Sequence, residues 1–264
     1  MKSINVVVAA SIALAAACGG GNAALSKSFS YGAPQALNAA EQSAASSAQA
    51  RLTDTTAFSS SPDAGKGAAI VAFADAISSA ALGGAELGGR RPTRPEIEGM
   101  LRAAALTDSC ATVSGGTVTF KGCSESHLGF KLTLNGFISA KAGTVDWNLA
   151  GGFSGADGSF SIDVGMHQSG TLSVRPSRVS GTALSEVGGS VSAQGQSAGF
   201  GLATAVLVDL GYQTTPRQCV TDGTVEVKRV WTQKPAGASG PAFADAAVKL
   251  SWTGCEAVQV ARSR

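Results

Sequence analysis

Charge and histidine are scarce in this 264-residue chain, and each scarcity makes a class of function less plausible. Asp, Glu, Lys and Arg make up 14% of the residues, against about 25% in typical soluble domains. The formal net charge is +2, and no basic stripe runs along the sequence. Because an electrostatic footprint for nucleic acid needs clustered Lys and Arg, we expect no nucleic-acid partner.

Motifs for metals and cofactors are equally scarce. No two cysteines have the C-x(2–4)-C spacing of zinc sites, and His127 and His167 are the only histidines. Asp157 and Asp163 do not form the D-x-D-x-D-G loop that calcium prefers. No pair of carboxylates stands out, and no phosphate-binding loop is present. We therefore expect no metal, no cofactor and no enzymatic activity.

One motif does match an enzyme family. The stretch Gly195-Gln196-Ser197-Ala198-Gly199 fits the G-x-S-x-G nucleophile elbow of lipases and esterases. In that family the catalytic histidine follows the serine, whereas both histidines of this chain precede Ser197. The motif also falls between two alternating segments, where a strand and a helix are needed. We interpret it as a turn, and a serine esterase acting through Ser197 is a remote alternative.

The first eighteen residues, MKSINVVVAASIALAAAC, have the pattern of a targeting signal. Lys2 precedes an uncharged, mostly apolar run from Ile4 to Ala17, which is shorter than the roughly 20 residues of a membrane-spanning helix. The run ends on Leu14-Ala15-Ala16-Ala17-Cys18, followed by three glycines. This ending resembles the lipobox of bacterial lipoprotein precursors, in which a signal peptidase cuts before the cysteine and a diacylglyceryl group is attached to it.

The resemblance implies a signal peptide over residues 1–17, a lipid on Cys18 and a place in the bacterial cell envelope. Gly19 after the cysteine suits a location at the outer membrane. The protein would contact that membrane through its N-terminal lipid anchor. Residues 18–60 are dominated by Ala, Ser, Gly and Asn. Such a stretch buries too little apolar surface to offset the entropy of ordering it. We expect it to be a flexible tether.

Residues 61–108 have the pattern of two amphipathic helices. The first starts at Ser61-Pro62-Asp63, where proline and a carboxylate suit the first turn. Apolar residues then recur every three or four positions. The second starts at Thr93, and Glu96 completes a capping box. Both helices would present an apolar face that needs a covering partner.

From residue 109 to 264 the apolar period changes to two, which marks strands with one buried face. The longest alternating stripe runs from Phe200 to Tyr212. Dipeptides suited to tight turns separate the stripes: Gly115-Gly116, Ala142-Gly143, Asp157-Gly158, Ser169-Gly170 and Asp222-Gly223. We predict a mainly β (α+β) fold, an antiparallel meander of about 8–11 strands. It would form a curved sheet or partial barrel with the two helices packed on it.

If Cys18 carries a lipid, four cysteines remain, an even number suited to an oxidising compartment. Cys110 and Cys123 flank the Gly115-Gly116 turn almost symmetrically. Cys219 and Cys255 are centred on the loop at residues 234–240. We predict that each pair forms a disulfide that clamps the open end of its own hairpin.

Two functions fit these expectations, both for a non-enzymatic, lipid-anchored envelope protein. In the first, the sheet and helices enclose an apolar small molecule or lipid. This layout resembles the envelope lipoprotein-carrier and receptor fold, which holds acyl chains between sheet and helices. In the second, the sheet folds on itself, and the protein is a structural, adhesive or assembly component of the cell surface without a ligand cavity.

Overall fold

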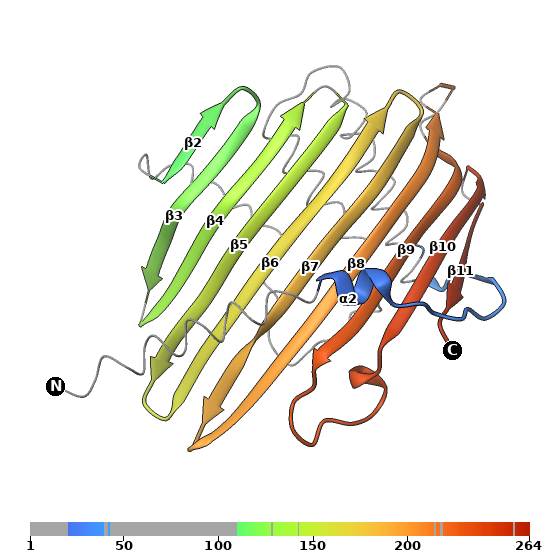
Figure 1. Cartoon of the computed structure of the whole chain (residues 1–264). Coiled ribbons are helices and arrows are strands. Elements are labelled where there is room, and N and C mark those ends of the chain that lie inside the picture. The colour runs from blue at the N-terminus through green and yellow to red at the C-terminus, as the bar shows by residue number, and fades with distance from the viewer. Residues whose placement is uncertain are drawn as a thin grey trace.

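The computed structural model describes residues 21–39, 42 and 110–264, except 128, 142, 214, 217, 218 and 256. These residues build one 11-stranded antiparallel sheet (Figure 1). The strand order is β1-β11-β10-β9-β8-β7-β6-β5-β4-β3-β2, and the sheet does not close into a barrel. The prediction of a mainly β, antiparallel meander is confirmed.

The strands lengthen from the edges toward the middle of the sheet. Their bounds are β1 Gln35–Ala36, β2 Ala111–Ser114, β3 Thr117–His127, β4 Phe130–Lys141, β5 Thr144–Asp157, β6 Phe160–Arg175, β7 Arg178–Ala193, β8 Gln196–Gln213, β9 Cys219–Gln233, β10 Ala246–Gly254 and β11 Ala257–Arg262. A short α-helix, α2, spans Gly21–Ser26, and a 3-10 turn, η1, spans Pro241–Phe243.

Two-residue turns join most consecutive strands. The β2–β3 turn is Gly115-Gly116, with φ values of 54° and 77°. The β7–β8 turn is Gln194-Gly195, with φ values of 52° and 80°. Positive φ at both central positions matches the right-handed twist of the flanking strands, which is why glycine recurs there. The turns predicted at Gly115-Gly116 and at Asp157-Gly158 are confirmed, and Gly143 lies between β4 and β5, as predicted, while Ala142 lies outside the described residues.

Two predicted turns are wrong. Ser169-Gly170 lies in the middle of β6, and Asp222-Gly223 lies inside β9. A Cβ added to Gly170 would lie 2.3 Å from Cζ2 of the Trp147 ring. At Gly223, φ is 106° and a Cβ would lie 2.1 Å from a backbone oxygen of the neighbouring strand. These glycines permit close approach within a strand, which spacing alone does not distinguish from a turn.

The two faces of the sheet differ in chemistry. On the apolar face, the most buried large side chains are at most 1% exposed and run from β5 to β11: Val145, Leu172, Val174, Val179, Leu210, Val220, Val225, Val227 and Val260. On the opposite, polar face, β4 to β7 carry mainly Ser, Thr, Asn, Asp and Gly. The alternation in the sequence therefore becomes a division between the faces, as predicted.

Residues 21–36 form a strap across the polar face (Figure 1). Ala24 of α2 is fully buried against Ala203, Ala205 and Val230 of β8 and β9. The chain then runs to the sheet edge, where β1 pairs with β11. The flexible tether predicted for residues 18–60 is thus wrong for this part. The small alanines that suggested disorder instead let the helix backbone lie close to the sheet.

The helical segment predicted over residues 61–108 lies outside the described residues. Within the part that the structure describes, α2 is the one α-helix whose residues are all described, Ala39 and Gln42 are also helical, and the prediction of two helices packed on the sheet is not borne out. Residues 38–109 connect opposite edges of the sheet, about 48 Å apart at the usual strand spacing. The residues on either side of this stretch, Leu37 and Cys110, both pack against the buried cluster of the apolar face.

Both predicted disulfides are present. Cys110–Cys123 joins the start of the β2–β3 hairpin, with Cα atoms 5.0 Å apart. Cys219–Cys255 joins the start of β9 to the residue after β10, with Cα atoms 5.4 Å apart. Each bond clamps the open end of its own hairpin, as the symmetric spacing of the cysteines about the two loops indicated.

Candidate functional site

One end of the apolar face is less buried than the other. Strand register places the following residues together on that end, over β4 to β8: Phe130, Leu132, Phe153, Phe160, Ile162, Val164, Val191 and Phe200. We call this set the outer patch. Phe160 is 39% exposed, and the others are half-buried. The outer patch is therefore an apolar surface within reach of a ligand.

Aromatic packing gives the outer patch a flat floor. The rings of Phe130 and Phe153 stack with centroids 5.4 Å apart and an interplanar angle of 2°. The Phe130 ring also lies over Gly155, its partner across the β4–β5 ladder, where a Cβ would lie 2.3 Å from the ring. Because Gly155 has no side chain, the ring lies flat on the sheet. Two parallel rings present a smooth surface suited to an acyl chain or another apolar body.

A polar row crosses the apolar face beside the outer patch. Register places Gln168, Ser185, Thr204 and Arg229 side by side on β6 to β9. Gln168, Ser185 and Thr204 are half-buried. Arg229 is 7% exposed, and its Nη2 donates to the carbonyl oxygen of Ala244 at 3.4 Å. This row separates the outer patch from the fully buried half of the face.

Charge is almost absent from the apolar side of β4 to β8. By register, Asp157 is the one Asp, Glu, Lys or Arg that these five strands place on that face, and it lies at the β5–β6 turn. An ionic ligand would find no counter-ion on the outer patch itself. The outer patch therefore offers apolar contacts and no ionic ones.

The strap makes electrostatic contacts with the polar face and with the β9–β10 connection. The Tyr31 hydroxyl donates a hydrogen bond to the Glu226 carboxylate, and burial together with this bond raises the pKa of Tyr31. Lys27 forms an ion pair with Asp245. Burial alone would raise the pKa of Asp245, but hydrogen bonds from Lys27 and from the Trp231 N–H lower it. These contacts fix residues 27–31 to β9 and to the β9–β10 connection.

A second polar contact on this face is structural. The Arg178 guanidinium forms two hydrogen bonds of 2.7 Å with the Asp209 carboxylate, which joins β7 to β8. The hydrogen bonds and the charge of Arg178 lower the pKa of Asp209. Since all groups are exposed and paired across neighbouring strands, this is a cross-strand ion pair.

The esterase motif does not form a nucleophile elbow. Gly195 lies in the β7–β8 turn, and Ser197 lies in β8, where it is exposed and pairs with Ser192. His167 lies on β6, with Nε2 at 3.0 Å from Oδ1 of Asn148. By register, Ser197 and His167 are six residues apart along the strand direction, or about 20 Å. The structure does not bring these two predicted candidates together.

Of the remaining residues that the sequence marked as candidates, the structure describes some and not others. His127 ends β3, and its backbone pairs opposite Phe130 at the margin of the outer patch. Cys18 lies outside the described residues. Sequence alternation placed the outer-patch residues on the buried face without marking them as a site. The sequence feature that could have indicated the site is the set of phenylalanines at positions 130, 153, 160 and 200.

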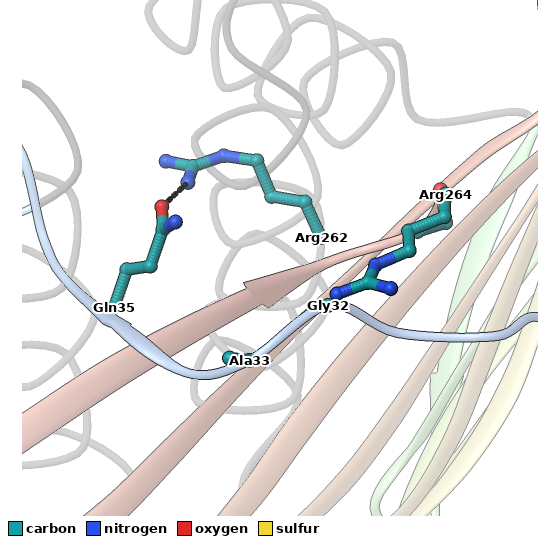
Figure 2. A pocket seen from close by; sticks show the side chains of 6 residues that line it. Gly32, Ala33, Gln35, Arg262 and Arg264 are labelled. Atoms are coloured by element: carbon teal, nitrogen blue, oxygen red, sulfur yellow. Dashed lines mark hydrogen bonds between the residues drawn. The ribbon is translucent and has the colours of Figure 1, made fainter.

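A pocket lined by described residues lies elsewhere, at the β1 edge (Figure 2). It is formed by the strap at Gly32, Ala33 and Gln35 and by the chain end at residues 262–264. Arg262 donates a hydrogen bond of 3.3 Å to Oε1 of Gln35 across it. This hollow results from the way the strap meets β11, and it is separate from the outer patch.

Among the described residues, no helix has the length and apolar character needed to span a membrane. Within the same part of the chain, no group of three or more His, Cys, Asp or Glu side chains is placed to hold a metal ion. Comparison with protein-family models, with curated proteins and with solved structures found no match for this chain.

Proposed function

We propose that this protein is a non-enzymatic, lipid-anchored protein of the bacterial envelope that binds an apolar ligand of the acyl-chain class on the outer patch. The single observation that carries the proposal is the burial gradient along the apolar face. Val145 and Leu172 at one end are fully buried, whereas Phe160 at the other end is 39% exposed. Large apolar side chains left accessible together mark an interaction surface.

The composition of the outer patch supports an acyl chain over other ligands. Its side chains are aromatic or branched aliphatic, and the stacked Phe130 and Phe153 rings offer a flat contact. Burying apolar ligand surface there contributes about 25 cal/mol per Å². The lipid on Cys18, which the N-terminal sequence predicts, would hold the domain in an envelope whose membranes contain such ligands.

Lipid analysis of purified protein tests the proposal. A Cys18→Ser variant of the full chain would be purified from the periplasm without detergent and extracted with organic solvent. Mass spectrometry should find fatty acids or phospholipids at a near-stoichiometric ratio. Empty protein that also fails to take up a fluorescent fatty acid would refute the ligand-binding function.

A structural role in the envelope is the second candidate, and the β2 edge favours it. In the described part of the chain β2 pairs with β3 alone, and Val113 on this edge strand is 73% exposed. An uncovered edge strand can pair with another chain. Chemical crosslinking should then join the β2 edge to a second protein, and ligand-free protein together with such crosslinks would favour this candidate.

A further inference from the structure

We propose that the strap fixes the orientation of the domain on its membrane, with the polar face of the sheet at β7–β9 turned toward the lipid headgroups. The inference rests on the proposed lipidation of Cys18. It adds to that function a surface and a partner: the face that carries α2, and the bilayer that holds the anchor.

The short chain between the anchor and α2 limits how far the lipidated residue can lie from the sheet. Cys18 precedes Gly21, the first residue of α2, by three positions. Three residues span at most about 11 Å when fully extended. The lipidated residue therefore lies within about 11 Å of the start of α2, whatever path the intervening glycines take.

Several contacts hold α2 and the rest of the strap on the polar face of the sheet. Ala24 is fully buried against β8 and β9 on the polar face. The Lys228 ammonium donates hydrogen bonds to the carbonyl oxygens of Leu25 and Lys27 at the end of the helix. Contacts follow at Tyr31 and at the β1–β11 pairing. A strap held at so many points cannot swing away as a free tether would.

These two constraints together set the orientation. A short link from a docked helix holds the helix-bearing face near the headgroups and leaves the apolar face turned away. Leu25, which is 36% exposed on α2, lies on the membrane-proximal side. The outer patch would then open to the periplasm or the medium and not to the bilayer that carries the anchor.

Site-specific quenching in proteoliposomes tests this orientation. The lipidated protein would be reconstituted with lipids that carry a nitroxide headgroup, a short-range quencher of fluorescence. One variant, Ala150→Cys, carries a fluorophore at an exposed position of the polar face. The matched variant, Ala198→Cys, carries it at an exposed position of the apolar face. We expect at least threefold stronger quenching for the polar-face probe.

A linker variant separates the short link from other causes. Inserting twenty Gly and Ser residues between Gly19 and Gly20 should abolish the difference between the two probes. Intact lipidation on Cys18, shown by mass spectrometry, with equal quenching of both probes would overturn the orientation alone. Absence of an acyl mass on Cys18 would overturn both the orientation and the proposed anchor.

Discussion

The ammonium group of Lys228 lies 3.0 Å from the carbonyl oxygen of Lys27 and donates a hydrogen bond to it. A second hydrogen bond, of 3.3 Å, reaches the carbonyl oxygen of Leu25. Carbonyl groups in the last turn of a helix have no partner within the helix, and a cation there also complements the helix dipole. One buried lysine of β9 therefore holds the end of α2.

Replacing Lys228 by methionine should loosen the strap. The variant Lys228→Met keeps most of the side-chain volume but leaves two carbonyl oxygens without their donor. We expect the free energy of unfolding in urea to fall by about 1–3 kcal/mol. Hydrogen exchange should rise in residues 24–31. The control Lys249→Met, on the same face of β10, should change stability by less than about 0.5 kcal/mol. Equal effects of the two variants would contradict the contact.

The Tyr31–Glu226 hydrogen bond predicts an alkaline dependence. Burial and this bond raise the pKa of Tyr31 in the folded protein, so the neutral phenol is the form that the fold stabilises. Its contribution is fully present below the unfolded pKa of about 10. It is lost as the pH rises through the folded-state pKa. Urea unfolding of the wild type and of Tyr31→Phe, compared from pH 8 to pH 11, should show the stability difference shrinking at the alkaline end. A constant difference would exclude this coupling.

The two disulfides should differ in their stabilisation. Cys219–Cys255 spans 36 residues and Cys110–Cys123 spans 13. In the loop-entropy description these separations correspond to about 4 and about 3 kcal/mol. Replacing both cysteines of a pair by alanine should therefore lower the melting temperature more for the Cys219–Cys255 pair. The measurement is calorimetry under non-reducing conditions, and the reverse order would show that native-state packing outweighs chain entropy.

Gly170 is expected to reject any side chain. A Cβ at this position would lie 2.3 Å from the Trp147 ring and 2.7 Å from a backbone oxygen of β7. Overpacking of a well-filled core costs about 1–3 kcal/mol, so Gly170→Ala should lower the free energy of unfolding by that amount. The neighbouring control Ser169→Ala, on the other face of β6, should change it by less than about 0.5 kcal/mol. A neutral Gly170→Ala would mean that the Trp147 ring can move aside.

Strict alternation made the fold readable from the sequence. Stripes such as Phe200 to Tyr212 require a buried face, and the two-residue turns leave antiparallel pairing as the simple connection. The disulfide pairs followed from hairpin symmetry. The strap could not be predicted, because Ala24 is no more apolar than its neighbours. Its burial depends on Ala203 and Ala205, which are adjacent only once β8 is in place.

The candidate site was less accessible to sequence reasoning. The pattern showed that Phe153 and Phe160 belong to the apolar face, but every residue of that face shares the same period. Register between β4 and β8 decides which apolar residues gather at one end. The esterase motif shows the opposite limit of sequence reasoning. Residues 195–199 match the motif locally, but the distance from Ser197 to a histidine is set by the strand register of the folded sheet.

The affinity of the outer patch for an acyl chain is the most direct test of the proposed function. Delipidated Cys18→Ser protein would be titrated with a fluorescent fatty acid, alone and with Phe153→Asp or Ser154→Asp added. Phe153 lies in the outer patch, whereas Ser154 is exposed on the polar face of the same strand. Because a carboxylate on the patch is costly to cover with an apolar chain, Phe153→Asp should weaken binding at least tenfold and Ser154→Asp should leave it unchanged. Equal affinities for the two variants, or no saturable binding by any of the proteins, would contradict the proposed function.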